Sequence, residues 1–424
     1  MPTPRSIQRT YLVLLLGNTL AASFIWGINT IFLLDAGLSN LEAFAANAFF
    51  TAGMVAFEVP TGIVADTIGR RMSYLLGTLT LTGSTLLYVL LWRIEAPFWE
   101  WAVASLLLGL GFTFFSGAVE AWLVDALAAT GFEGALETVF GRGQIVTGAG
   151  MLIGSVAGGF IAAQISLGAP FVARGIVLLV MFALAFRLMH DVGFTPERGG
   201  RPLAEMRTIW SNSIEYGWRE PAVKWLMLGA LFTGGVGIYA FYALQPYLLE
   251  LYGDPEAYQV AGLVAAIVAG AQILGGIAAP RIRRLFRRRT SALLVTAGLS
   301  ALTLGLVGVL DTFWGVITLV VVWGLLFAAT MPIRQAYLNG MIPSRQRATI
   351  ISFDSMMASS GGVWAQPLLG RSADAWGYGP SYLLAAGISA LALPFLLLSR
   401  REDNPADTLV EGSGGDPQPA PQPA

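Results

Sequence analysis

Twelve long apolar runs dominate the sequence, and they restrict what the chain can fold into more than any other feature. A helix needs about 20 mostly apolar residues to cross the hydrocarbon core of a bilayer. The runs are rich in glycine and other small residues, which let membrane helices pack closely. They lie near residues 11–34, 41–65, 72–92, 98–124, 144–166, 168–190, 222–249, 257–280, 290–310, 313–339, 349–370 and 378–399. The sequence therefore predicts an all-α membrane protein with twelve transmembrane helices.

The charge content supports lipid as the surrounding solvent. Only 12% of the residues are charged and 55% are hydrophobic, whereas a soluble domain carries roughly 25% charged residues. The net charge of -1 gives no indication of nucleic-acid binding. The chain has no cysteine and one histidine, His190, which excludes disulfides and metal sites built from several cysteines or histidines. We therefore expect no metal site and no cofactor.

The distribution of basic residues predicts how the helices are oriented. Arginines precede the first run and fill alternate loops after it, whereas acidic residues such as Asp35, Glu95 and Glu250 occupy the other loops. Because basic loops are retained on the cytoplasmic side, this pattern predicts that both termini are cytoplasmic. The run 11–34 is too long for the apolar region of a cleavable signal peptide. We expect an integral protein of the cell membrane.

A long polar connection divides the spans six and six. We predict an N-terminal bundle over residues 1–190, a cytoplasmic linker over 191–221 and a C-terminal bundle over 222–400. The linker contains an amphipathic stretch, Leu203 to Trp218, which suits a position on the membrane surface; a regulatory segment is the alternative. Residues 401–424 are rich in glycine and proline and cannot bury a core, so we expect a disordered cytoplasmic tail.

The connection between the second and third spans carries the most specific motif in the chain. It reads Gly62-x-x-x-Asp66-x-x-Gly69-Arg70-Arg71. Gly62 lets a neighbouring helix approach closely, Asp66 follows on the same helix face, and Gly69 suits a sharp turn. The motif resembles the cytoplasmic latch between helices 2 and 3 of the major facilitator superfamily of transporters. This resemblance implies two pseudo-symmetric six-helix bundles that give alternating access to a central cavity.

The same resemblance implies partners for the latch. Asp125, at the end of the fourth span, is expected to pair with Arg70. Asp66 is expected to face the N-terminus of the eleventh span, where unpaired amides favour an anion. Both contacts would hold the bundles together on the cytoplasmic side and leave the cavity open to the outside. The latch spacing recurs around Asp374 after the eleventh span, as inverted three-helix repeats would produce.

Charged side chains inside apolar spans are the candidates for proton coupling, because they are costly in lipid and usually functional. Four of them fall in the cytoplasmic half, and they are Glu58, Glu120, Arg334 and Asp354. Arg174 falls in the outer part of the sixth span. A network of structural ion pairs that closes the cytoplasmic end is an equally good interpretation. Glu120 is the better candidate of the two glutamates, since the related position of the tenth span carries Gln335, which cannot titrate.

The fifth span carries a row of glycines. They are Gly141, Gly150, Gly154, Gly158 and Gly159. The pattern resembles the glycine-rich fifth helix of drug–proton antiporters, with Ser155 where proline is expected. Ordinary helix packing, which also needs small residues, is the alternative. One departure weakens the antiporter interpretation: the arginine that those antiporters carry in the fourth helix, four residues before a glycine, is replaced by Ser105 relative to Gly109.

Aromatic and amide side chains recur on the spans that the resemblance places around the cavity. Such walls suit a hydrophobic or amphipathic organic solute, whereas a sugar or phosphate carrier would show denser polar residues. The alternative for each ring is contact with lipid or with a neighbouring helix. The candidate lining residues are Asn18, Trp26, Asn29, Phe115, Tyr239, Tyr242, Gln245 and Trp323.

Together these features predict a monomeric secondary transporter that exports hydrophobic or amphipathic small molecules in exchange for protons, and not an enzyme. The sequence has no Gly-x4-Gly-Lys-Ser/Thr loop, so ATP does not drive it directly. A metabolite uptake carrier is the first alternative, and a non-transporting membrane sensor on the same fold is the second. An intact latch together with intramembrane carboxylates favours transport over sensing.

Overall fold

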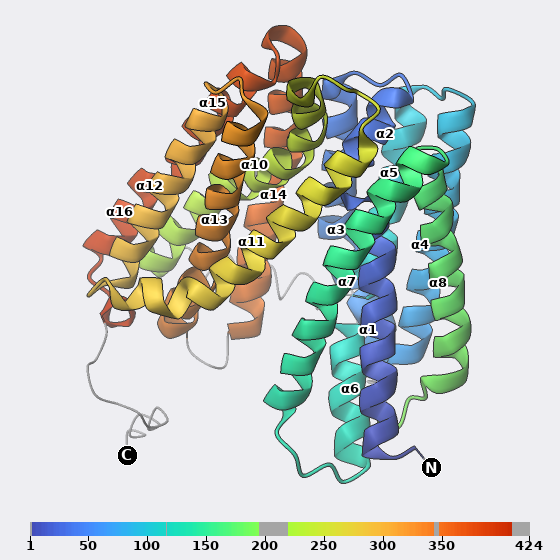
Figure 1. Ribbon diagram of the computed structural model, residues 1–424. Helices are drawn as coiled ribbons and strands as arrows, with labels where there is room; N and C mark the ends of the chain where they lie inside the picture. The colour runs from blue at the N-terminus through green and yellow to red at the C-terminus, as the bar shows by residue number, and fades with distance from the viewer. Residues whose placement is uncertain (1, 116, 195–218, 343–346, 409–424) are drawn as a thin grey trace.

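The structure is a computed structural model in which the two halves of the chain form two helical bundles side by side (Figure 1). It describes residues 2–115, 117–194, 219–342 and 347–408. The amphipathic stretch predicted over 203–218 and the tail beyond residue 408 lie outside these ranges. Following the predicted orientation, we call the end of the molecule that holds α2 the outer end, and the end that holds the N terminus the inner end.

The first bundle runs from blue to green in Figure 1. Its two long N-terminal helices begin with capping boxes, Thr3 with Ser6 and Ser39 with Glu42, in which side chains satisfy free backbone amides. Gly69 precedes α4 with a φ of 127°, a conformation that glycine adopts without strain. The helices are α1 (Pro4–Trp26), α2 (Asn29–Asp35), α3 (Asn40–Thr67), α4 (Arg70–Arg93), α5 (Phe98–Thr113), α6 (Ala118–Ala129), α7 (Leu136–Gln164) and α8 (Ala169–Leu188).

The second bundle runs from yellow-green to red. Several of its helices contain an internal proline, as membrane helices tolerate when neighbouring groups satisfy the freed carbonyl. The helices are α10 (Pro221–Tyr252), α11 (Tyr258–Arg284), α12 (Arg289–Val307), α13 (Phe313–Met341), α14 (Arg347–Trp376), α15 (Tyr378–Ala390), α16 (Ala392–Arg401) and the short 3-10 helix η2 (Pro405–Asp407).

The described helices supply the twelve predicted spans. Ten segments are long and apolar enough to cross a bilayer, with α5 and α6 forming one of them and α15 and α16 another. The α1–α2 pair, bent by 47°, is the eleventh. The twelfth is α14, which is less apolar because it carries groups such as Asp354 and Asp374, but it packs against α3, α10 and α15, so that protein covers much of it. The predicted all-α fold is confirmed.

The two bundles meet along two helix pairs, α3 with α14 and α7 with α11. At the outer end the α1–α2 break and α7 both touch the backbone of α11. A Cβ added to Gly27 or to Gly159 would lie 2.8 Å from the Cα of Gly262, so only glycine fits at this crossing. Toward the inner end the ribbons of the two bundles diverge (Figure 1).

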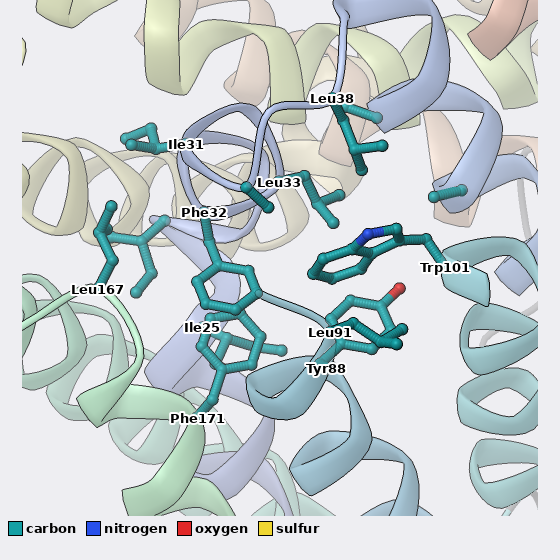
Figure 2. Packing of buried hydrophobic residues seen from close by; sticks show 14 of the residues in the cluster. Ile25, Ile31, Phe32, Leu33, Leu38, Tyr88, Leu91, Trp101, Leu167 and Phe171 are labelled. Atoms are coloured by element: carbon teal, nitrogen blue, oxygen red, sulfur yellow. The ribbon is translucent and has the colours of Figure 1, made fainter. Parts of the chain in front are cut away.

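A cluster of rings anchors the outer end of the first bundle, as Figure 2 shows. Phe32 of α2 stacks on Phe171 of α8 with ring centroids 4.0 Å apart, and it meets Trp101 of α5 edge-on at 6.0 Å. Tyr88 of α4 meets the same tryptophan at 5.1 Å. Each such pair contributes roughly 0.5–1.5 kcal/mol beyond its buried area. The cluster therefore fixes the short helix α2 against three spans of its own bundle.

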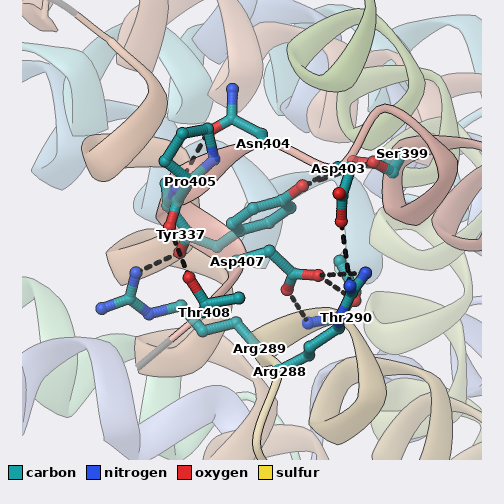
Figure 3. Close-up of polar contacts among 11 residues, drawn as sticks. Arg288, Arg289, Thr290, Tyr337, Ser399, Asp403, Asn404, Pro405, Asp407 and Thr408 are labelled. Carbon is teal, nitrogen blue, oxygen red and sulfur yellow. Dashed lines mark hydrogen bonds and ion pairs between the residues drawn. The ribbon is translucent and has the colours of Figure 1, made fainter. Parts of the chain in front are cut away.

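The segment that follows α16 is ordered as far as the structure describes it (Figure 3). Asp407 is buried and accepts hydrogen bonds of 2.7 Å from the backbone amide and from the hydroxyl of Thr290. Its carboxylate thus caps the start of α12, and Arg288 pairs with Asp403 at 2.9 Å. The prediction of a disordered tail is therefore wrong for residues 402–408, because this acid satisfies amides that would otherwise lack a partner.

Candidate functional site: a central cavity and its closures

The latch loop between α3 and α4 is held by groups of its own bundle. Arg70 forms an ion pair with Asp66, and its Nε lies 3.8 Å from the Oδ2 of Asp125. Asp191, which follows α8, accepts a 2.9 Å hydrogen bond from the backbone amide of Arg71. The structure therefore brings Arg70 close to Asp125, as the sequence predicts, and adds Asp191 as a further contact.

One prediction for this loop is wrong in the observed conformation, and another stays a prediction. Asp66 is expected at the N-terminus of α14, yet its partner among the described residues is Arg70. Gly62 is expected to allow a close helix approach, yet no atom lies within 4 Å of the position its Cβ would take. The open space beside Gly62 agrees with the divergence of the two bundles toward the inner end (Figure 1). Residues 343–346, directly before α14, lie outside the described ranges, so the contact of Asp66 with that N-terminus stays a prediction.

An acid at the outer end makes the kind of contact that the sequence predicts for Asp66. The carboxylate of Asp374, near the end of α14, accepts hydrogen bonds of 2.9 Å from the backbone amides of Asn40 and of Leu41. These are the first two residues of α3, where free amides and the helix dipole favour a negative charge. The hydroxyl of Tyr378 donates to the side-chain oxygen of Asn40 at 2.6 Å. The start of α3 is thus bound to the second bundle.

A buried amide closes the same end of the molecule. Gln245 of α10 is 4% exposed, and its side-chain oxygen accepts a 3.0 Å hydrogen bond from the amide of Thr30. Its side-chain nitrogen donates to the carbonyl of Trp26. Both partners flank the α1–α2 break, where the helix leaves backbone groups free. These contacts close the outer end, which is the reverse of the outward-open state that the latch residues lead one to expect.

The central cavity lies on the face of the first bundle and has a volume of about 200 Å³. Helices α1, α5, α6, α7 and α8 contribute to its walls. Apolar and aromatic groups make up most of the lining, with a few polar side chains among them. The residues that decide its chemistry are Asn18, Trp26, Phe112, Phe115, Glu120 and Arg174. Such a lining suits an aromatic or aliphatic body that carries a small number of polar groups.

Two opposite charges share this cavity without pairing. Glu120 is half-buried in the first turn of α6, where the helix dipole favours its negative charge. Arg174, in the outer part of α8, is 6% exposed. No ion pair of either residue within 4.0 Å is found among the described residues. No group of three acidic or histidine side chains in that part of the chain is placed to hold a metal ion.

In the second bundle, by contrast, two buried charges pair with each other. Arg334 and Asp354 form a two-pronged ion pair with nitrogen–oxygen distances of 2.5 and 2.6 Å, and Arg334 also donates to the carbonyl of Leu226. Arg334 borders a narrow cavity of about 60 Å³ inside the bundle. The prediction of one network that also includes Glu120 is wrong, because Glu120 lines the cavity of the other bundle.

The family assignment rests on the length of chain that a family model covers. The Major Facilitator Superfamily model matches residues 11–365 and, in a second match, 261–422. The chain belongs to the Major Facilitator Superfamily. Its members are transporters of small molecules, so this chain is an integral membrane transporter and not an enzyme.

Individual members of the superfamily show how far the similarity extends. Multidrug resistance protein MdtG of Salmonella dublin is 25% identical over 337 residues, which are 77% of each chain. The nucleoside transporter NupG has a TM-score of 0.75 at 12% identity, over 94% of this chain and 99% of that chain. A D-xylose–proton symporter has a TM-score of 0.67 at 17% identity, over 93% and 96%. At these identities the solved structures share the superfamily fold alone.

Some of the side chains predicted to line the cavity do line one of the two cavities described above, and others do not. Asn18, Trp26 and Phe115 line the central cavity, and Trp323 borders the narrow one in the second bundle. Tyr242 is half-buried on α10 and lines neither of these two cavities.

The remaining three candidates line neither of these two cavities. Asn29 donates to the side chain of Asn47 at 3.1 Å, and Gln245 belongs to the outer closure. Tyr239 is fully buried in the second bundle, where its hydroxyl pairs with Ser381. Periodicity does not distinguish these positions from lining residues, because both sets face away from lipid.

The glycines of the fifth span serve close helix packing. A Cβ on Gly150, Gly154 or Gly158 would meet α1, and the last of these would lie 1.9 Å from the carbonyl oxygen of Phe24. Gly159 faces α11 instead, whereas Gly141 has open space around it. α7 therefore links α1 to the second bundle. A role of these glycines in antiport remains a prediction.

Asp374 and Arg174 are not among the site residues that the sequence predicts, although both carry important charges at this site. Asp374 shares the spacing of the latch, which is the signal that could have identified it. Arg174 is visible in the sequence as an intramembrane charge, but its position in the outer part of α8 separates it from the other charges. Glu58, in contrast, is exposed on α3 and does not line either cavity described above.

Proposed function

We propose that this transporter exports amphipathic small molecules in exchange for protons, with Glu120 as the coupling residue. The bundles alternate between the observed state, closed at the outer end, and a state closed at the inner end. The solute enters the central cavity from the cytoplasm and leaves on the other side. The protein acts as a monomer in the cell membrane with both termini in the cytoplasm, as the distribution of arginines supports.

The observation that carries the proposal is the position of Glu120 in an apolar, aromatic cavity. A carboxyl group there can hold a proton or bind a cationic part of the solute, but not both at once. Competition for one site is what antiport requires, because proton binding then releases the solute and solute binding releases the proton. Arg334 and Asp354 cannot act in this way while they pair with each other.

The similarity to MdtG supports the direction and the kind of solute. That protein is a multidrug resistance protein by name, and its similarity extends over most of this chain. The rings of Trp26, Phe112 and Phe115 offer the apolar surface that drug-like molecules need. Nucleoside and sugar carriers share the fold but are too distant in sequence to favour uptake.

The test is transport in vesicles that contain the purified protein. A fluorescent bisbenzimide dye serves as the probe, and a pH gradient is imposed across the membrane. We expect the wild type to move the dye against its gradient and opposite to the protons. Glu120→Gln should abolish this pH-driven movement but keep dye exchange without a gradient, because the glutamine keeps the shape of the site and cannot titrate.

Glu100→Gln is the matched control, since Glu100 is an exposed glutamate in the first turn of α5. It should behave like the wild type. If Glu120→Gln still concentrates the dye against its gradient, Glu120 is a structural residue and the coupling proposal fails. If the wild type moves the dye in the same direction as the protons, export by antiport is contradicted.

A further inference from the structure

Arg174 is a buried cation for which the described residues provide no counter-ion. It is 6% exposed, and its Nε has no hydrogen-bond partner. No carboxylate of the described residues lies within 4.0 Å of its guanidinium group. Since a charge inside a span is costly unless it is paired, such a residue normally has a functional partner.

The surroundings of Arg174 do not neutralise its charge. It interacts electrostatically with Tyr88 and Tyr242, whose hydroxyls are neutral near pH 7. The hydroxyl of Tyr88 is already paired with Ser105 at 2.6 Å. Tyr242 belongs to the second bundle, so Arg174 lies where the two bundles face each other. Arg174 also lines the central cavity.

The cavity therefore presents a cation and an anion at different depths. Arg174 lies in the outer part of α8, and Glu120 lies in the inner part of the span formed by α5 and α6. They line one cavity and remain farther apart than an ion pair allows. Rings of Trp26, Phe112 and Phe115 are part of the same wall. A ligand that matches this lining has an apolar body with a negative group toward Arg174 and a positive group toward Glu120.

We propose that the central cavity binds amphoteric aromatic molecules, with Arg174 binding a carboxylate and Glu120 binding an ammonium group of the same solute. The planar guanidinium group suits a carboxylate, to which it can donate two parallel hydrogen bonds. The ammonium group competes with the proton at Glu120, so the inference rests on the proposed antiport and names its substrate class. The carboxylate contact adds selectivity without taking part in the competition.

The test compares three forms of one fluorescent aromatic scaffold. Ciprofloxacin carries a carboxylate and an ammonium group, its methyl ester keeps only the cation, and its N-acetyl derivative keeps only the anion. Binding to the purified protein in detergent is measured by fluorescence titration. We expect the wild type to bind ciprofloxacin at least tenfold more tightly than either derivative. Arg174→Gln should reduce its affinity to that of the ester, and leave binding of the ester unchanged.

Arg174→Lys is the control for misfolding, because lysine keeps the positive charge but lacks the planar guanidinium group. It should retain part of the preference for ciprofloxacin over the ester. Glu120→Gln should weaken binding of ciprofloxacin and the ester, but not of the N-acetyl derivative. The proposal is overturned if the wild type binds ciprofloxacin and its ester equally, or if it binds neither of them. It is also overturned if Arg174→Gln still binds ciprofloxacin more tightly than the ester.

Failure of this inference can be told apart from failure of the proposed function. If the bisbenzimide dye is still driven by the pH gradient while the three scaffold forms show no charge preference, only the amphoteric site is wrong. If the dye is not transported at all by the wild type, the proposed antiport is wrong, whatever the binding preferences are.

Discussion

Asp374 and Asp66 occupy corresponding positions at opposite ends of the molecule, yet they bind different partners. Each has a glycine four residues before it and another three residues after it. Asp374 binds two backbone amides at the start of α3, in the other bundle, whereas Asp66 pairs with Arg70 beside it in the chain. One acid thus closes the outer end between the bundles, while its counterpart at the inner end pairs within its own bundle among the described residues.

This difference suggests how the transporter changes state. In the opposite conformation Asp66 would bind the N-terminus of α14, and Asp374 would leave the N-terminus of α3. Hydrogen bonds to a charged group contribute about 1.5–3 kcal/mol each. That is comparable with the few kcal/mol that separate two populated conformations. A single carboxylate at each end is therefore sufficient to bias the equilibrium.

The largest effect is expected from an acid that lies within one bundle and takes no part in this exchange. Asp354→Asn would leave Arg334 as an uncompensated buried charge, because their ion pair is the main contact of both groups. Removing one partner of a buried pair costs about 3–5 kcal/mol. Unfolding of the purified protein in mixed micelles with increasing sodium dodecyl sulfate would measure the loss. The double variant Arg334→Met with Asp354→Leu should recover most of it, and equal stability of wild type and Asp354→Asn would contradict the account.

Asp374→Asn should shift the conformation rather than unfold the protein. Asparagine keeps one acceptor oxygen, so the loss of one charge-assisted bond to α3 removes about 1.5–3 kcal/mol from the outer closure. This corresponds to a shift of roughly 10- to 150-fold in the equilibrium. Because the chain has no cysteine, one can be placed in the cavity at Ala22, which lines it. Its labelling by an impermeant maleimide added outside should become faster.

Asp311→Asn is the control for this change, because Asp311 is an exposed acid in another loop at the outer end. It should leave the labelling rate unchanged. An unaltered rate in Asp374→Asn would show that Gln245 and the helix contacts close the outer end without help from the acid.

Asp66→Ala should have the smallest effect, and in the opposite direction. Its side chain is 44% exposed in the observed state, where an ion pair of this kind contributes at most about 0.5 kcal/mol. The opposite state would lose a contact to a helix N-terminus, which contributes about 0.3–1 kcal/mol. Labelling of the Ala22→Cys site from the cytoplasmic side should therefore rise up to fivefold and turnover should fall, with similar changes in Arg70→Ala and on charge reversal at Asp125. Unchanged labelling in all three would exclude a latch role for this loop.

The fold could be predicted because each span carries its own signal. Hydropathy located α14 even though Asp354 and Asp374 interrupt it. The orientation that the arginines indicate stays a prediction. The resemblance placed Arg70 near Asp125, and both lie in one bundle, 3.8 Å apart. Asp407 could not be predicted in the same way, because its partner Thr290 is 117 residues away in the sequence.

The conformation and the pairing of charges could not be predicted from the sequence. The latch motif is compatible with both states, so it indicates where the inner closure forms but not whether it is formed. Whether a buried arginine is paired depends on helices that are distant in the sequence. Arg334 meets Asp354 on the next span, whereas Arg174 lines the central cavity of the first bundle.

Distances between spin labels report directly on the exchange of closures between the two ends of the molecule. One pair of cysteines at Ile68 and Leu285 reports on the inner end, and another at Trp99 and Trp376 reports on the outer end; all four side chains are exposed. Double electron–electron resonance is recorded for each pair in the background of Asp374→Asn and in the otherwise unchanged chain. We expect Asp374→Asn to lengthen the outer distance and to shorten the inner one. Distances that change together, or an inner distance that stays constant while the outer one grows, would contradict this expectation.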